Sequence, residues 1–414
     1  MNSSPYYDDL ETRAPEAREG ALMARLPGLV AHAVAKAPGW AELLAGVDPQ
    51  AISSRKALAQ LPVLRKDRLK ELQHARPPFG GLATLEPGRM GRLFMSPGPI
   101  LEPEPVRENS WRAARAMWAA GVRPGQIVQN CFGYHLTPGA WMVDSAARAI
   151  GCAVIPAGIG QTEQQIELIR MYGPDAFVGT PSFLRIIVEK AKETGADISR
   201  LKRALLGAEA LPPSLRAWFR EQGMETVLQW YGTAELGNIA YESEAMEGMI
   251  LDEELILEIV RPGTGEPVTD GEVGEVVVTS FNAEYPMIRI ATGDLSAVME
   301  GPSPCGRTNV RIKGWMGRAD QTTKVRGMFV HPAQVAQIVM RHAEIARARL
   351  VVTGRMADDA MTLRCEVDGE PEGLAARVVE TIRDVTKLRG EVELVARGTL
   401  PNDGKVIEDA RKYD

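Results

Sequence analysis

The strongest constraint on the fold is an alternation of amphipathic, helix-like segments with short apolar, strand-like segments between residues 110 and 230. The helix-like segments are 110–120, 137–150, 163–172, 182–194 and 213–222. The strand-like segments that follow them are 127–132, 153–156, 176–179, 204–206 and 226–230. Strands that are apolar throughout are typical of a parallel sheet covered by helices on both faces. The pattern therefore predicts an α/β domain with a mostly parallel, helix-covered sheet.

The pattern changes after Gly248. Strand-like segments at 255–260, 275–280 and 286–290 are separated by turn-rich segments such as 261–267, which predicts an antiparallel or barrel-like, β-rich appendage.

Beyond Gly317 a shorter mixed pattern follows, long enough for a small separate domain. It comprises helix-like 332–342, strand-like 347–353 and 361–367, helix-like 371–388 and strand-like 391–395. We expect a large domain over residues 1–317 and a small, mobile α+β domain over residues 318–414.

The composition is that of a globular protein, with 45% hydrophobic and 25% charged residues in 414. The net charge of −6 comes without a basic tract, so nucleic acid is not expected as a partner. The beginning of the chain is polar and acidic, and no apolar run is long enough to span a bilayer. We therefore expect no secretory signal, no membrane partner and a cytoplasmic location.

The cysteines are scattered through the chain without a CxxC pair, at Cys131, Cys152, Cys305 and Cys365. This spacing favours reduced thiols, most of them buried, over a disulfide framework.

Residues 230–235, Trp-Tyr-Gly-Thr-Ala-Glu, follow a predicted strand and place several chemically useful groups in one turn. Tyr231 could cover a purine ring, Gly232 allows close backbone approach, and Glu235 could hold Mg²⁺ against phosphate. The alternative interpretation is a plain strand-end turn in which Thr233 caps a helix.

Three further segments have a plain structural interpretation, and the first of them also has a functional one. Asp294 could satisfy its own backbone in a turn or accept the hydroxyls of a ribose at a strand end. Residues 317–332 could be a solvated linker before a helix that opens at Pro332. Lys405 follows a turn, where a lysine is usually just exposed.

Taken together and in this order, the segments resemble the adenylate-forming superfamily of acyl-CoA synthetases, peptide-synthetase adenylation domains and luciferases. The resemblance is to its phenylacetate-CoA ligase branch and extends over nearly the whole chain. The segments that carry it are YYDDLETR (6–13), VIP (154–156), GQTEQQ (160–165), GTPS (179–182), GAE (207–209), EVGE (272–275) and GRAD (317–320).

This resemblance implies an ATP-dependent acid–thiol ligase. A small carboxylic acid first attacks the α-phosphate of ATP, which releases pyrophosphate and leaves an acyl-adenylate. The thiol of coenzyme A then displaces AMP. Such chemistry depends mainly on positioning and charge stabilisation, with Mg²⁺ as the metal. By analogy we also expect a homodimer.

The resemblance assigns nucleotide contacts to the matching positions. Glu235 holds Mg²⁺, Tyr231 stacks on adenine, and Asp294 binds ribose. The remaining nucleotide-binding positions are Gly207, Ala208, Glu209, Gly232, Thr233 and Arg318.

The resemblance also implies a movement between the two half-reactions. Lys405 bridges the carboxylate and the α-phosphate during adenylation only. Asp320 is the hinge about which the small domain turns, so that a coenzyme A face with Lys324, Arg326 and Gly327 replaces the lysine.

The segment that should form the family's phosphate loop departs from the pattern. Residues 95–103 read Met-Ser-Pro-Gly-Pro-Ile-Leu-Glu-Pro, in which only Ser96 and Gly98 suit a phosphate, the prolines lack N–H groups and no lysine is present. Either this loop contributes little to the rate or ATP chemistry is impaired. We favour retained chemistry because the other catalytic positions are filled.

Many relatives carry a structural zinc site where this chain has Ser243, Ile250 and Ser303, leaving Cys305 as the one thiolate. One thiolate does not make a tetrahedral site, so we predict no structural zinc.

The expected acyl pocket combines polar rings with short side chains. It is bordered by Tyr134, His135, Gly139, Ala140, Ala208, Gly237 and Asn238. The rings could indicate a hydroxylated or heteroaromatic acid within an aryl, arylacetic or related class. The favoured alternative is that His135 is a packed, hydrogen-bonded residue.

Two other functions remain open. The acyl group could pass to a carrier-protein thiol, since the same hinge serves both acceptors. The altered residues 95–103 also allow an adenylation-defective nucleotide- or acyl-CoA-binding protein.

Overall fold

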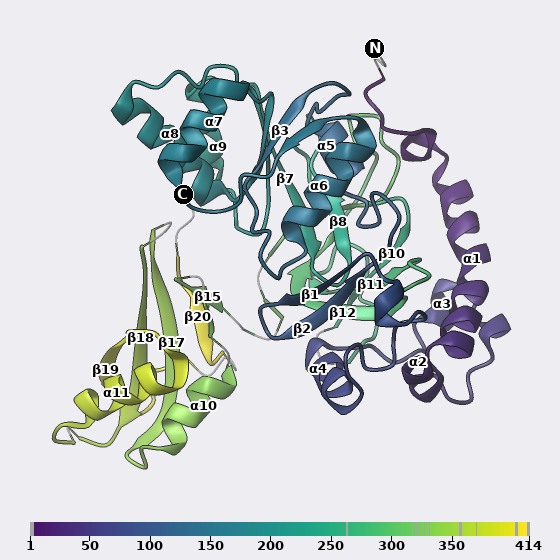
Figure 1. The fold of residues 1–414 in the computed structure, drawn as a ribbon. Coiled ribbons are helices and arrows are strands. Elements are labelled where there is room, and N and C mark those ends of the chain that lie inside the picture. Colours follow the sequence, from purple (N-terminus) through teal and green to yellow (C-terminus); the bar gives the residue numbers. More distant parts are fainter. Residues whose placement is uncertain are drawn as a thin grey trace. The chain divides into compact units, whose positions relative to one another are not determined.

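The computed structural model divides the chain into two compact units, Met1–Met316 and Gly317–Asp414, which Figure 1 shows along the colour gradient from purple to yellow. It describes residues 4–261, 264–316, 318–319, 321, 323–326, 328–330, 332–355, 358–369, 371–401 and 405–411. The two units are described separately below.

The first unit is built on a nine-stranded sheet of order β13-β14-β9-β8-β7-β6-β5-β3-β4. The strands from β4 to β7 are all parallel, and those from β8 to β13 are antiparallel to their neighbours. The parallel strands are β3 (Ile127–Asn130), β4 (Ala153–Ile155), β5 (Ala176–Gly179), β6 (Arg203–Leu206) and β7 (Thr226–Thr233). The antiparallel strands are β8 (Gly237–Tyr241), β9 (Met249–Leu251), β13 (Val298–Met299) and β14 (Arg311–Ile312). The predicted parallel α/β sheet is confirmed.

A helix precedes each parallel strand along the chain, as the amphipathic pattern predicts, and the helices after β3 connect these strands as crossovers. They are α5 (Ala114–Ala119), α6 (Gly139–Ile150), α7 (Thr162–Tyr172), α8 (Pro181–Thr194) and α9 (Pro213–Glu221), labelled in Figure 1. Helix α8 begins where the Thr180 hydroxyl accepts from Phe183 N–H at 3.3 Å, with Pro181 at the first helical position, and it ends at Gly195 in the left-handed conformation.

The N-terminal helices pack with a three-stranded antiparallel sheet of order β10-β11-β12, which is the predicted β-rich appendage. The strands are β10 (Leu255–Val260), β11 (Gly274–Ser280) and β12 (Met287–Ser296). The helices are η1 (Asp9–Thr12), α1 (Pro15–Lys36), α2 (Pro38–Leu43), η2 (Pro49–Ala51), α3 (Arg55–Leu58), α4 (Lys66–Ala75) and η3 (Pro87–Arg89). A hairpin of β1 (Arg92–Ser96) and β2 (Ile100–Glu104) completes the unit.

Buried ion pairs tie the N-terminal segment to the rest of this unit. Arg307 donates to Glu11 Oε1 at 2.6 Å, and Tyr241 OH donates to the same oxygen at 2.8 Å. Arg18 donates to Glu253 Oε2 at 2.7 Å, with both side chains almost fully buried. Because a buried charge is costly without a partner, these pairs hold the segment that contains residues 6–13 in one place.

The boundaries of α5, β7 and β12 differ from the sequence prediction by several residues. Helix α5 begins at Ala114 rather than at 110, because Asn109 and Arg112 have positive φ angles of 50° and 61° and Asn109 Oδ1 accepts from Ala114 N–H. Strand β7 continues to Thr233 and β12 to Ser296. Tyr231 therefore lies within a strand, where the prediction of a turn was wrong, and Asp294 lies near a strand end, which is the second of its two interpretations.

The second unit is an α+β unit around a four-stranded sheet of order β19-β18-β17-β20. Its strands are β17 (Ile345–Arg355), β18 (Asp358–Val367), β19 (Glu391–Ala396) and β20 (Ile407–Asp409), next to a hairpin of β15 (Thr323–Val325) and β16 (Met328–Val330). The helices α10 (Pro332–Met340) and α11 (Leu374–Thr386) are shorter than the predicted 332–342 and 371–388.

Among the residues described, no helix is both long and apolar enough to cross a membrane. The cysteines are all free, with Cys131, Cys152 and Cys365 buried and Cys305 half-buried, as predicted.

Candidate functional site

The candidate site begins at the carboxyl ends of the neighbouring parallel strands β6 and β7, where α/β sheets usually bind their ligands. Gly207 follows β6 directly and is buried. A Cβ atom at this position would lie 2.4 Å from Nε1 of Trp230 on β7, so the indole requires a glycine here. Ala208 is exposed and has a positive φ of 64°.

Glu209, predicted to frame the nucleotide, is held by the start of α8. Ser182 donates from N–H to Glu209 Oε2 at 3.1 Å and from its hydroxyl to Oε1 at 2.9 Å. A carboxylate at a helix N-terminus satisfies N–H groups that lack partners within the helix. Glu209 therefore has a structural role that fixes the segment Gly207–Ala208–Glu209 against the sheet.

Tyr231 and Asp294, predicted on separate segments, are brought together by the structure. Tyr231 OH donates to Asp294 Oδ2 at 2.8 Å, and Trp315 Nε1–H donates to Oδ1 at 3.1 Å. The sequence prediction missed Trp315, because nothing local in its segment indicates this contact. These two contacts fix the carboxylate of Asp294 near the end of β12, and a carboxylate oxygen is the kind of acceptor that a ribose hydroxyl requires.

Glu235 lies in the turn between β7 and β8, and only 5% of its surface is exposed. Its Oε1 is 3.0 Å from Lys66 Nζ, while Oε2 is buried and has no hydrogen-bond partner among the described residues. Burial, the largest influence, would raise the pKa of Glu235, but the charge of Lys66 and hydrogen bonds from Lys66, Thr233 and the backbone together outweigh it, so the pKa is lowered. An ionised carboxylate with an unpaired oxygen fits a hard cation such as Mg²⁺.

Lys66 was not predicted from the sequence. It opens α4, and the residues before this helix add to the edge of β12. Leu64 N–H donates to Arg289 O at 2.9 Å, and Leu64 O accepts from Ala291 N–H at 2.9 Å. This pairing brings a lysine from early in the chain to the carboxylate of Glu235.

The predicted phosphate loop is the β1–β2 hairpin. The hydroxyl of Ser96 donates to Glu102 Oε1 at 2.6 Å, and its N–H donates to Oε2 at 3.2 Å. Burial, together with the nearby charge of Glu235, raises the pKa of Glu102 to about 8. Gly98 has a φ of 148°, and a Cβ atom there would lie 3.8 Å from Lys70 Nζ of α4. The sequence prediction missed both Glu102 and Lys70.

Helix α4 also clamps the hairpin through one side chain. Gln73 Nε2 donates to Leu101 O at 2.7 Å, and Gln73 Oε1 accepts from Leu101 N–H at 2.9 Å. The same amide donates to Tyr285 OH at 3.3 Å. Lys66, Lys70 and the hairpin are therefore held together by one helix.

The residues predicted to border the acyl pocket lie in different environments. Tyr134 is half-buried, with its OH accepting from Asn130 Nδ2 at 2.9 Å and its ring 5.0 Å from that of Trp141. His135 is exposed, so the favoured prediction of a packed histidine was wrong. It lies in the segment between β3 and α6, where Leu136 has a positive φ of 60°.

Gly139 and Ala140 open α6, and Ala140 is fully buried. Asn238 on β8 is also fully buried, and its Nδ2 donates to Arg112 O at 3.4 Å. Gly237 has a φ of 73°, and a Cβ atom there would meet Trp111 O at 2.6 Å. Their part in acid binding stays a prediction.

At the positions of the expected zinc ligands, the Ser303 hydroxyl lies 3.1 Å from Cys305 Sγ. Burial would raise the pKa of Cys305, but hydrogen bonds from Ser243, Ser303 and Arg307 lower it. The described residues contain no cluster of three or more histidine, cysteine or acidic side chains placed to hold a metal ion.

The second unit carries the remaining predicted residues. Lys405 is exposed just before β20, where Val406 N–H and Ile407 N–H donate to Gln321 Oε1 at 2.7 and 3.3 Å. Arg326, at the tip of the β15–β16 hairpin, donates to Asp359 O at 2.8 Å. Arg318 is half-buried, and Lys324 lies on β15. Asp320 and Gly327 lie outside the described residues.

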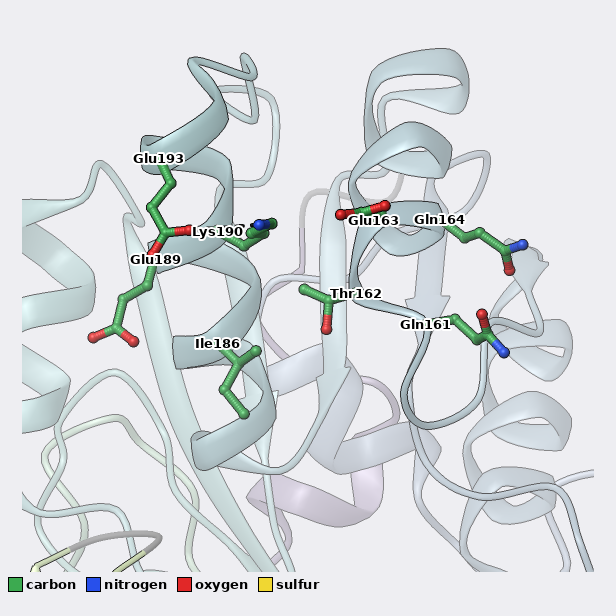
Figure 2. A pocket seen from close by; sticks show the side chains of 8 residues that line it. All are labelled: Gln161, Thr162, Glu163, Gln164, Ile186, Glu189, Lys190 and Glu193. Atoms are coloured by element: carbon green, nitrogen blue, oxygen red, sulfur yellow. Dashed lines mark ion pairs between the residues drawn. The ribbon is translucent and has the colours of Figure 1, made fainter.

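A separate hollow of about 570 Å³ lies between the start of α7 and the side of α8. Figure 2 shows Gln161, Thr162, Glu163 and Gln164 on one side and Ile186, Glu189, Lys190 and Glu193 on the other. Lys190 Nζ lies 3.6 Å from Glu193 Oε2. None of these residues belongs to the predicted site.

The chain is similar to known proteins in both sequence and structure. The AMP-binding enzyme family matches residues 139–283. A phenylacetate-coenzyme A ligase of Thermus thermophilus is 31% identical over 97% of this chain and 94% of its own length. One from Pseudomonas putida is 30% identical over 96% of this chain and 95% of its own. The crystal structure of 2-hydroxyisobutyryl-CoA ligase with 2-HIB-AMP and CoA matches with a TM-score of 0.81 and 25% identity, covering 100% of this chain and 94% of that one.

The fold and these matches define an adenylate-forming, AMP-binding enzyme of the CoA ligase class. Within that class the chain belongs to the phenylacetate-CoA ligase family, as its sequence motifs indicated.

Proposed function

We propose that this chain is an ATP-dependent acid–thiol ligase that joins an aryl, arylacetic or related carboxylic acid to coenzyme A. The observation that carries the proposal is the joint arrangement of Tyr231, Asp294 and Glu235 at the end of β7, in a chain whose relatives over almost its full length are CoA ligases. A homodimer and a cytoplasmic location stay predictions by analogy.

The proposed reaction has two steps that balance in atoms and charge. A carboxylate oxygen of the acid forms a bond to the α-phosphorus of ATP, and the bond to the β-phosphate oxygen breaks to release pyrophosphate. The thiol of coenzyme A then loses its proton to solvent, and its sulfur bonds to the acyl carbon. The bond from that carbon to the phosphate oxygen breaks, so AMP leaves with the oxygen that came from the acid.

Within the first unit, the proposal gives binding and positioning roles to this chain's own side chains. Asp294, held by Tyr231 OH and Trp315 Nε1–H, accepts from the ribose. The ring of Tyr231 covers the adenine. Small side chains at the ends of β6 and β7 leave room for it, namely those of Gly207, Ala208, Gly232 and Thr233. Fixed acceptors of this kind reduce the entropy lost on reaching the reactive geometry.

Mg²⁺ would be held by Glu235, through the oxygen that has no partner among the described residues, and would neutralise developing phosphate charge. Lys66, which otherwise neutralises Glu235, would then be available to a phosphate oxygen. The proposed roles of Mg²⁺ and Lys66 both rest on the burial and the negative charge of the Glu235 carboxylate.

The second unit supplies Lys405 for adenylation and the segment with Lys324, Arg326 and Gly327 for the coenzyme A step, with Asp320 as the hinge and Arg318 as a nucleotide contact. These assignments rest on the family resemblance alone. Gln321 supports the first of them, because its side chain fixes the backbone that follows Lys405.

A panel of aryl, arylacetic and short-chain acids tests the proposal, with purified protein, ATP, Mg²⁺ and coenzyme A. We expect at least one acid to give AMP and its acyl-CoA in equal amounts, measured by liquid chromatography and mass spectrometry. If no acid gives either product although the protein binds ATP, the chain is an adenylation-defective nucleotide-binding protein instead. The Ser96–Glu102 contact is what favours that second candidate.

If acyl-AMP forms but coenzyme A does not accelerate its loss, the acceptor is a different thiol. A carrier protein loaded with phosphopantetheine, added in place of coenzyme A, then tests the carrier alternative directly.

A further inference from the structure

The phosphate hairpin contains a buried carboxyl group, that of Glu102, which already occupies donors of the loop. Both hydrogen-bond donors of Ser96 end on the carboxyl group of Glu102, at 2.6 Å from the hydroxyl and 3.2 Å from the N–H. Glu102 is completely buried and Ser96 is 8% exposed, so water does not compete for this contact. A carboxylate and a phosphate offer such donors the same kind of oxygen acceptor.

Several other donors of the hairpin are also in use or missing. Met95 N–H donates to Leu136 O at 2.8 Å, and Leu101 N–H donates to Gln73 Oε1 at 2.9 Å. Pro97 and Pro99 have no N–H group. A loop that cradles phosphate needs several N–H groups pointing at one anion, and this hairpin has committed those of Met95, Ser96 and Leu101 to other partners.

We propose that Glu102 determines the phosphate affinity of this site by occupying the Ser96 donors in place of pyrophosphate. The hairpin then borders the site in a fixed conformation and does not enclose the pyrophosphate. The chain binds pyrophosphate weakly because a phosphate oxygen would have to displace the Glu102 carboxyl group from the Ser96 donors. The inference rests on the proposed function, in which pyrophosphate is a product.

Binding of inorganic pyrophosphate with Mg²⁺ to the full-length protein, measured by isothermal titration calorimetry, tests the inference. Glu102→Ala frees both donors of Ser96, and we expect it to bind pyrophosphate at least about tenfold more tightly, as hydrogen bonds to a charged group allow. Ser96→Ala alone should bind within about twofold of the unmodified protein.

The double variant Ser96→Ala with Glu102→Ala is the matched control for simple charge repulsion. We expect the double variant to bind pyrophosphate more weakly than Glu102→Ala alone, because the Ser96 hydroxyl that Glu102 occupied is absent. A gain that persists in the double variant, or a Glu102→Ala variant with no gain, would overturn the inference. Weaker binding by Ser96→Ala alone would also overturn it, since Ser96 would then already contact phosphate.

Thermal melts establish whether each variant is folded. If Glu102→Ala does not fold, the comparison of Ser96→Ala with the unmodified protein still tests the inference, because it shows whether Ser96 contributes to pyrophosphate binding. Failure of the proposed function is distinguishable, because it would appear as absent acyl-CoA and AMP in the acid panel, whereas these titrations need no turnover.

Discussion

At the scale of single residues, Glu102 links protonation to stability. Its pKa of about 8 in the folded protein lies above the ordinary value of 4.5, so the folded state retains a proton that the unfolded chain releases between these values. Stability contributed by the protonated group is present below pH 4.5 and is lost as the pH rises toward 8. At about 1.4 kcal/mol per pKa unit, the loss is at most a few kcal/mol.

Glu102→Gln removes this proton linkage. Urea unfolding at pH 5 and pH 8.5, in EDTA, should show that the unmodified protein loses more stability across this range than the variant does. Parallel pH profiles of the two proteins would show that Glu102 ionises normally in the folded state.

Substitution of Gly207 tests how closely the end of β6 approaches β7. Gly207→Ala places a Cβ atom 2.4 Å from Trp230 Nε1, so the indole must move, at a cost of about 1–3 kcal/mol. Gly139→Ala is the control, because nothing lies within 4 Å of its Cβ position. Thermal melts should show a loss for the first variant only, and equal melting temperatures would contradict the packing described.

At the scale of elements, α4 connects the phosphate hairpin with Glu235. Gln73→Met keeps the size of the side chain but leaves Leu101 N–H and O without their partner, which should cost about 1–3 kcal/mol. Gln60→Met, at an exposed position, serves as the control. Urea unfolding measures both, and a loss no larger than that of the control would mean that the clamp does not stabilise the hairpin.

The sequence predicted elements better than contacts. Apolar periodicity located β10 and the parallel strands, because burial on both faces leaves a continuous apolar run. It did not predict β1 and β2, since Pro97 and Pro99 indicate a loop. Lys66 and Glu102 were missed for another reason: each becomes part of the site only through tertiary packing, on a helix and a hairpin with no motif of their own.

At the scale of the whole molecule, the two units have different roles in the proposed reaction. Lys405→Ala should abolish acyl-adenylate formation but spare acyl-CoA formation from chemically prepared acyl-adenylate, because the lysine acts in the first half-reaction only. Lys387→Ala, an exposed lysine of the same unit, is the control and should retain both. Single-turnover assays of each half-reaction measure this. Equal losses in both would contradict the division of roles.

The central claim is that the acid attacks the α-phosphate of ATP. An acid labelled with ¹⁸O in its carboxylate, turned over with ATP and coenzyme A and followed by mass spectrometry, tests this most directly. We expect AMP to acquire one labelled oxygen and pyrophosphate to acquire none. Label in orthophosphate with ADP as the product, or unlabelled AMP, would contradict an acyl-adenylate route.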